Sequence, residues 1–240
     1  MKPIIGVTCA WSPESKLHEA DKEFYYIHCG YSGAIIRAGG IPVLMSPPQA
    51  EEVDLEAYAD DMLEKMDALY FSGGVGSKWV GQKLPLYDQQ PVRSAWEDVL
   101  LKKAYERDIP VLGVCRGHQT ITVALGGSLD KDFYPPHRQE QPYHEGHHTV
   151  KIAEGSLLGK LVGTEDWFVN SIHTQKVEMA PPGFVISART EDGSVEAVES
   201  TEKAFFLSTQ FHPELMIYDE RGKQVLRAFV EAAEAYSRKK

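Results

Sequence analysis

The sequence predicts an α/β fold in which a mostly parallel central sheet carries a small antiparallel extension. Through the first half of the chain, short apolar runs of strand length alternate with stretches of helical periodicity, which is typical of a parallel sheet covered by helices. After residue 127 the pattern changes to short strand-like pieces separated by Gly, Pro and Asp. The length of 240 residues suits one such unit, so we expect residues 1–240 to form a single domain.

The first half of the chain contains the alternating elements. Gly39 and Gly40 end the first helical stretch, because glycine commonly terminates helices. The expected elements are, in order, a strand at 3–9, a helix at 24–38, a strand at 41–47, a helix near 50–65, a strand within 67–74, a helix at about 93–107 and a buried strand at 110–115.

The second half contains the strand-like pieces and a final helix. Asp219 and Glu220 open that helix, where acidic side chains suit the positive helix N-terminus. The expected elements are strands at 148–153, 183–190, 194–200 and 204–211, then a helix at about 219–238.

Composition excludes several classes of protein. A formal net charge of −10 disfavours nucleic acid as a partner, and no segment has the eighteen or more apolar residues of a membrane span. Cys9, Cys29 and Cys115 are odd in number and lack the paired spacing of a zinc or redox motif, which suits a reducing cytoplasm. The N-terminal run is typical of a first strand rather than a secretory signal, so we expect a cytoplasmic location without membrane contact.

Cys115 lies in a pattern typical of a nucleophile. An apolar strand runs into it, and Gly113 and Gly117 flank it in a G-x-C-x-G arrangement. Such a strand-to-helix turn lifts a nucleophile above the sheet, and the helix N-terminus favours a thiolate. The N–H of Arg116, with that of Gly73 or Gly74, would then stabilise an oxyanion. The alternative is a buried cysteine whose glycines only close a tight turn.

His212 and Glu214 follow the apolar run at 204–211, with Pro213 between them. A thiol nucleophile needs a neighbouring imidazole as base, and a carboxylate fixes the tautomer of that imidazole and stabilises its charge. Taken alone, His212 is more often a structural or solvated histidine. Together with the Cys115 pattern, it predicts a Cys-His-Glu triad.

The motifs G-V-C-R-G-H-Q at 113–119 and Q-F-H-P-E at 210–214 resemble those of class I glutamine amidotransferases. The segments PIIGVT, YSGAIIRAGGIPVLMSP, SGG, GGSLDKDF and VNSIHTQ resemble the branch of γ-glutamyl-γ-aminobutyrate hydrolases, peptidase C26, over nearly the whole chain. The resemblance implies a flavodoxin-like three-layer sandwich. It also implies hydrolysis of γ-glutamyl amides, as in polyamine catabolism, without metal or organic cofactor.

Carried over by position, the resemblance makes Cys115 the nucleophile, His212 the base and Glu214 its orienting carboxylate, with Gly74 and Arg116 as oxyanion donors. It also implies residues that bind the substrate. These are Gly73, Gln119, Asn170, Ser171 and His173, with the side chain of Arg116 as a further candidate. For Asn170, Ser171 and His173 the alternative is a set of polar residues that stabilise a turn.

Two departures from the family pattern leave the released amine open. The family commonly has an acidic residue soon after the glycine loop and a second histidine after the N-S-x-H motif, where this chain has GGVGSKW and Thr174. The loop at 75–90, with Trp79 and Tyr87, is expected to line the mouth of the site.

Three functions therefore stand. The first is a hydrolase acting on γ-glutamyl-γ-aminobutyrate or a related amide through a thioester; the second is a glutaminase subunit that supplies ammonia to a separate synthetase. The third is a binding protein for a γ-glutamyl metabolite. The expected partner is a small γ-glutamyl substrate, and the oligomeric state is open, with a homodimer as one arrangement.

The histidine-rich segment at 137–148 raises the question of a metal site. His137, His144, Glu145, His147 and His148 are ligand types, but their irregular spacing in a Pro- and Gln-rich stretch favours a lid or substrate loop, so we expect no metal. Outside that segment, Tyr25, Tyr26 and Tyr31 are expected to pack on the sheet from the first helix, although one near its start could face the site. Glu97 could support the pocket from the helix that follows the glycine loop, but an acidic residue on a helix is usually solvated, and that is the expectation here.

Overall fold

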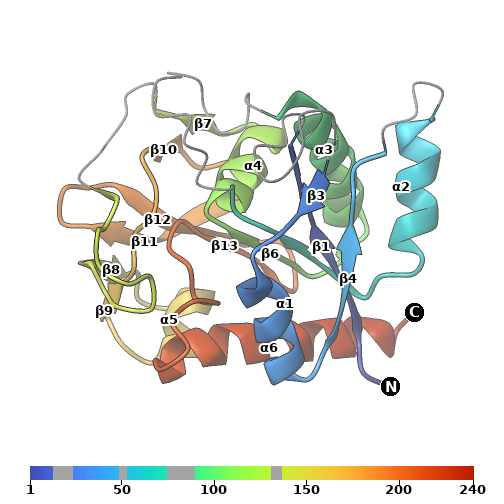
Figure 1. The fold of residues 1–240 in the computed structure, drawn as a ribbon. Coiled ribbons are helices and arrows are strands. Elements are labelled where there is room, and N and C mark those ends of the chain that lie inside the picture. The colour runs from blue at the N-terminus through green and yellow to red at the C-terminus, as the bar shows by residue number, and fades with distance from the viewer. Residues whose placement is uncertain (13–23, 49–52, 75–89, 131–136) are drawn as a thin grey trace.

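The structure is a computed structural model that describes residues 1–12, 24–48, 53–74, 90–130 and 137–240. Its centre is a sheet whose strands run in the order β4-β1-β5-β6-β13-β12-β11-β8-β9, with β10 and β7 attached beside β12 (Figure 1). A separate two-stranded ribbon is formed by β2 (Ala10–Ser12) and β3 (Phe24–Tyr26).

The first five strands of this order are parallel, as the sequence predicts. They are β4 (Ile41–Met45), β1 (Ile4–Thr8), β5 (Ala68–Phe71), β6 (Val111–Val114) and β13 (Phe206–Thr209). Side chains alternate between the two faces: Ala68 and Tyr70 belong to one apolar core, while Leu69 and Phe71 belong to the other. Both faces of β1, β5, β6 and β13 are buried, which explains why these strands are continuous apolar runs, whereas Ile41 and Leu44 of the edge strand β4 are exposed.

The remaining strands form the antiparallel extension. β12 (Val195–Ser200) pairs antiparallel with β13, and β11 (Phe184–Thr190), β8 (His148–Ile152) and β9 (Asp166–Val169) continue the sheet. Two short strands, β10 (Val177–Met179) and β7 (Ser128–Leu129), pair with each other beside β12.

Helices cover both faces and complete three layers (Figure 1). One face carries α1 (Cys29–Ala38), α5 (Leu157–Val162) and α6 (Glu220–Ser237). The other carries α2 (Leu55–Leu63), α3 (Pro91–Glu106) and α4 (Arg116–Ala124). The predicted start of the last helix is confirmed, since the Asp219 side chain accepts a hydrogen bond from Arg221 N. None of the helices in the described residues has the length and apolarity needed to cross a bilayer.

The helix expected at 24–38 is wrong in its first part. Residues 24–26 form β3, which pairs with β2, and the helix begins only at Cys29 because the His28 side chain caps it by accepting from Gly30 N. Tyr25 and Tyr26 therefore lie in a ribbon rather than on the helix. Tyr31 does lie near the helix start and is buried.

Some predicted segments fall outside the described residues. They are the start of the helix at 50–65, the loop at 75–89 with Trp79 and Tyr87, and residues 131–136.

Candidate active site

Cys115 lies at a sharp turn between β6 and α4. It has a positive φ of 55°, uncommon for a residue with a side chain, and such strain is frequent at functional sites. The flanking glycines are required by space: a Cβ on Gly117 would lie 2.0 Å from the backbone oxygen of Phe71, and one on Gly113 would lie 2.4 Å from Ile121 Cδ1. The Cys115 N–H donates to the Thr209 carbonyl on β13 (2.8 Å), which ties the turn to the neighbouring strand.

His212 and Glu214 follow β13, the strand that pairs with β6, so they reach the same carboxyl edge of the parallel sheet as Cys115. His212 Nδ1 lies 2.7 Å from Glu214 Oε1, and the Tyr70 hydroxyl donates weakly to Glu214 Oε2 at 3.5 Å. Nε2 of His212 makes no hydrogen bond to a nitrogen or oxygen atom of the described residues. Burial lowers the pKa of His212, but Glu214 and then Cys115 outweigh it and raise the pKa to about 10.

Gly73 lies beside both Cys115 and His212. A Cβ at this position would lie 3.2 Å from His212 Cε1, 3.4 Å from Cys115 Cβ and 2.5 Å from the Tyr31 hydroxyl, so only glycine fits between them. The N–H of Gly73 donates to that hydroxyl at 2.8 Å. Of the two glycines considered for the oxyanion, Gly73 thus has its N–H already engaged.

The carbonyl of Gly73 is held from the other side by Arg93, whose guanidinium donates to Gly73 O at 3.1 Å and to Ser72 O at 2.9 Å. Because the C=O and N–H of a trans peptide point in opposite directions, this contact turns the Gly74 N–H away from Arg93. Arg116 is the first residue of α4, so its N–H lies at the helix N-terminus, directly after Cys115.

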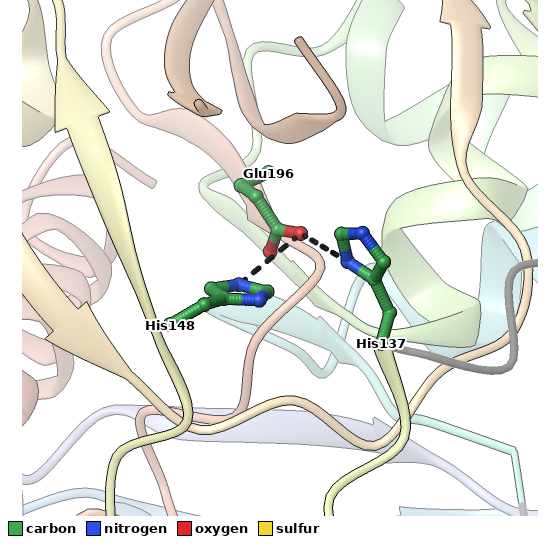
Figure 2. Close-up of side chains that lie close together, drawn as sticks. All are labelled: His137, His148 and Glu196. Carbon is green, nitrogen blue, oxygen red and sulfur yellow. Dashed lines mark ion pairs between the residues drawn. The ribbon is translucent and has the colours of Figure 1, made fainter. Parts of the chain in front are cut away.

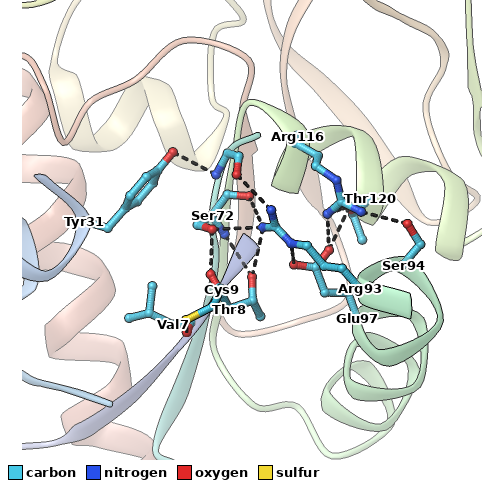
Figure 3. Close-up of polar contacts among 11 residues, drawn as sticks. Val7, Thr8, Cys9, Tyr31, Ser72, Arg93, Ser94, Glu97, Arg116 and Thr120 are labelled. Carbon is cyan, nitrogen blue, oxygen red and sulfur yellow. Dashed lines mark hydrogen bonds and ion pairs between the residues drawn. The ribbon is translucent and has the colours of Figure 1, made fainter. Parts of the chain in front are cut away.

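Glu97 is fully buried, which corrects the expectation that it is solvated. It pairs with Arg93 (2.7 Å) and with Arg116, and Arg116 also donates to Ser94 Oγ (Figure 3). Burial raises the pKa of Glu97, but the two guanidinium groups outweigh it and hold the pKa below its usual value. This buried network joins the glycine loop to the Cys115 turn, and the side chain of Arg116 points into it.

Asn170 holds the backbone of His212. Its Oδ1 accepts from His212 N at 2.7 Å, and its Nδ2 donates to His212 O at 3.0 Å and to Tyr143 O at 2.8 Å. Its amide group is therefore engaged with protein backbone.

The other residues proposed to bind substrate are also buried and partnered. Ser171 Oγ donates to the His137 carbonyl, and His173 Nδ1 donates to the Gln175 carbonyl at 2.8 Å. Gln119 Nε2 donates to Gln210 Oε1 at 3.1 Å, whereas Gln119 Oε1 is buried without a hydrogen-bond partner in the described residues. Two buried acceptors among these three side chains, Gln119 Oε1 and His173 Nε2, therefore make no hydrogen bond within the described residues.

The structure thus gathers Cys115, His212, Glu214 and Gly73 at one point, with Asn170 behind the histidine. Three further residues around the site were missed or misjudged from the sequence: Tyr70, Arg93 and Glu97. Tyr31 packs in the core as expected, and its hydroxyl also reaches the site. The spacing of Arg93 and Glu97, four residues apart on a helix, was the available signal for their ion pair, but nothing local indicated that both are buried.

Comparisons with known proteins show the family of this chain. The sequence pattern of the Peptidase C26 family matches residues 3–214. Gamma-glutamyl-gamma-aminobutyrate hydrolase of Escherichia coli K12 is 35% identical over 199 residues, covering 77% of this chain and 76% of the relative. A Mycobacterium tuberculosis protein, assigned by its name to the glutamine amidotransferases, is 34% identical over 98% of this chain and 76% of its own length.

Solved structures show the same fold. The glutaminase domain of Trypanosoma brucei CTPS, solved with acivicin, superposes with a TM-score of 0.65 at 18% identity, covering 97% of this chain and 94% of that one. This likeness confirms the flavodoxin-like α/β class, and the sequence relatives identify a glutamine amidotransferase-like hydrolase. By its matched family pattern and its relatives, the chain belongs to the peptidase C26 family.

Proposed function

We propose that this protein hydrolyses a γ-glutamyl amide to glutamate and a free amine through a γ-glutamyl thioester on Cys115. The observation that carries the proposal is the placement of Cys115 on a strained turn beside an imidazole that Glu214 holds at 2.7 Å. A pKa of about 10 for His212 means that the ring holds a proton at neutral pH, as an imidazolium paired with a thiolate would.

In the first half of the reaction, the thiolate sulfur of Cys115 attacks the γ-carbonyl carbon, and the electron pair moves to the carbonyl oxygen. The backbone N–H groups of Gly74 and Arg116 stabilise that oxyanion. Collapse of the intermediate breaks the C–N bond, and His212 gives its Nε2 proton to the leaving nitrogen. A thioester and a free amine result.

In the second half, water attacks the thioester carbon and gives a proton to His212. The C–S bond breaks, glutamate leaves, and the thiolate-imidazolium pair is restored. Gln119 Oε1, buried and without a partner in the described residues, is suited to accept from the α-amino group of the glutamyl unit.

The favoured donor is γ-glutamyl-γ-aminobutyrate or a related γ-glutamyl amine, because a relative with 35% identity bears that activity in its name. Such a substrate would place the protein in polyamine catabolism. We also propose a cytoplasmic location, which agrees with three cysteines that form no disulfide, two of them buried.

The test compares wild type with Cys115→Ala on γ-glutamyl-γ-aminobutyrate, other γ-glutamyl amines and glutamine, with glutamate and amine measured by mass spectrometry. We expect amine release from wild type and none from the variant. Cys29→Ala, which removes the exposed thiol, is the matched control and should keep full activity. Turnover of glutamine only, or no release from wild type, would overturn the proposed substrate.

A further inference from the structure

Glu196 lies at the centre of a cluster of three histidines outside the triad. Figure 2 shows its ion pairs with two of them, His137 and His148. Its side chain is fully buried on β12. His148 comes from the start of β8, His173 from the segment after β9, and His137 from a segment that pairs with residue 172 through Arg138. Four parts of the chain therefore bring one carboxylate and three imidazoles together.

Two of the three distances in this cluster are longer than those of hydrogen bonds, and the third is at the upper end of their range. Glu196 Oε1 lies 3.2 Å from His173 Nε2, 3.5 Å from His148 Nε2 and 3.7 Å from His137 Nδ1. Charge-assisted hydrogen bonds between such groups are about 2.7–2.9 Å long. Neighbouring ligands of a tetrahedral first-row cation, at bond lengths of about 2.0–2.1 Å, lie about 3.3 Å apart. The observed separations therefore match ligand-to-ligand distances better than donor-to-acceptor distances.

The outer hydrogen bonds set the direction of two rings. His173 donates from Nδ1 to the Gln175 carbonyl, and His137 Nε2 lies 3.0 Å from Asp192 Oδ2. In the neutral form, each ring then turns the lone pair of its other nitrogen toward Glu196. A carbonyl or carboxylate on the outer nitrogen is the usual arrangement of histidines that bind metals.

Lone pairs that converge on a buried carboxylate repel each other unless a cation lies between them. His148 Nε2, His173 Nε2 and both carboxylate oxygens of Glu196 are buried without hydrogen-bond partners in the part of the chain that the structure describes. Buried polar atoms of native proteins rarely lack partners, so this group indicates a missing positive charge.

We propose that His137, His148, His173 and Glu196 bind a divalent first-row transition cation of the zinc class. Imidazole nitrogens and one carboxylate oxygen are ligands that such cations prefer, and four protein ligands are typical of a structural site rather than a catalytic one. The ligand atoms of His137, His148 and Glu196 already lie within 4.8 Å of one another, and the His148 side chain is 17% exposed, which leaves a path for entry.

This site differs from the metal site considered for the histidine-rich segment in the sequence. Of the five residues in the 137–148 segment, only His137 and His148 take part, and the other two ligands come from distant strands and turns. His144 lies outside the cluster and is exposed. The irregular local spacing was therefore uninformative about a site built by the fold.

A bound cation would brace the segment that supports the proposed base. His173 lies three residues after Asn170, whose amide clamps the backbone of His212, and Ser171 between them donates to the His137 carbonyl. The inference is independent of the proposed reaction, because metal binding is measured without substrate.

The test uses the full chain, stripped with a chelator, loaded with ZnCl₂ and dialysed, with zinc measured by mass spectrometry. We expect about one zinc per chain in wild type. His148→Ala should lose it, and His144→Ala, the matched control on the same segment, should keep it. Cys115→Ser should also keep it, which separates this cluster from zinc held by the thiolate.

Two measurements on wild type alone test the proposal even if His148→Ala fails to fold. Zinc should raise the melting temperature of the stripped protein, and a chelator should reverse the rise. The Co²⁺-loaded protein should show the visible d–d bands of tetrahedral cobalt, lost on adding zinc. Wild type without retained zinc and without a shift in melting temperature would overturn the proposal, since protonated histidines would then neutralise Glu196. Equal retention by His148→Ala would overturn it as well.

Discussion

At the scale of single residues, Glu214 controls the protonation of His212. We predict that Glu214→Gln lowers the pKa of His212, because burial then acts without the opposing carboxylate. In the proposed reaction this imidazolium protonates the leaving amine. In the variant the ring would lose its proton at a lower pH than in wild type, so the alkaline limb of the kcat/KM profile should move to lower pH. The loss in kcat/KM at neutral pH should be about 10²- to 10⁴-fold.

Glu154→Gln is the control for this prediction, since Glu154 is exposed. It should leave both the rate and the profile unchanged. An alkaline limb that stays in place in Glu214→Gln would show that Glu214 does not set the pKa of His212.

Glu97 is the second residue whose charge has a consequence that can be measured. Its pKa is lowered on folding, so its ion pairs stabilise the protein above the unfolded pKa of about 4.3, and this stabilisation is lost as the pH falls through the folded pKa. We predict that Glu97→Gln lowers the free energy of unfolding by about 3–5 kcal/mol at pH 7, because two buried guanidinium groups lose their counter-charge. The difference from wild type should narrow toward acid pH.

Urea denaturation at several pH values measures this difference. Glu106→Gln, an exposed position on the same helix, should match wild type throughout. A difference that stays constant with pH would mean that Glu97 acts through packing rather than through its charge.

At the scale of elements, the turn at Cys115 depends on the contact between α4 and β5. We predict that Gly117→Ala destabilises the protein by about 3 kcal/mol, because its Cβ would lie 2.0 Å from the Phe71 backbone oxygen, which cannot rotate away. Helix α4 would have to shift, and a displacement of this kind near a reacting group costs about 10²-fold in rate.

Gly33→Ala on α1 is the matched control. Its Cβ would meet only the flexible end of Arg37, at 3.1 Å, and alanine favours a helix by about 1 kcal/mol over glycine. Thermal melts and amine release measure both variants. Equal effects of the two substitutions would show that the tight contact at Gly117 is not required.

Some of the helices and strands could be predicted from the sequence and others could not. The parallel strands and α6 were predictable because each is a local pattern, an apolar run or a capped amphipathic stretch. The short strands β7, β9 and β10 were not, since they are not continuous apolar runs and their two to four residues carry too little periodicity. β3 was assigned to a helix because its aromatics also fit helical spacing.

For the site, the motifs around Cys115 and His212 led to residues that the structure places together. Local sequence did not indicate the pairing of Glu97 with Arg116 or the partners of Glu196, because long-range contacts decide them.

At the scale of the whole molecule, one apolar core joins the parallel and antiparallel halves of the sheet. It includes Ile5 and Val7 from β1 as well as Val150 and Ile152 from β8, and α6 packs across it together with α1 and α5. The two halves also share the β13–β12 pairing, where Gln210 N donates to Glu196 O at 2.7 Å. Neither half therefore buries its apolar surface without the other.

From this shared core we predict that residues 1–240 unfold as one cooperative unit, as expected for a single domain. Hydrogen exchange in increasing urea, followed by mass spectrometry, should give peptides from β5 and from β11 the same limiting free energy of opening. If one half unfolded alone, the apolar side chains that it covers on the other half would be exposed to water. The free-energy cost would be about 25 cal/mol per Å² of exposed apolar surface. Exchange of β11 at clearly lower urea than β5 would instead identify the antiparallel extension as a separate folding unit attached to a parallel core.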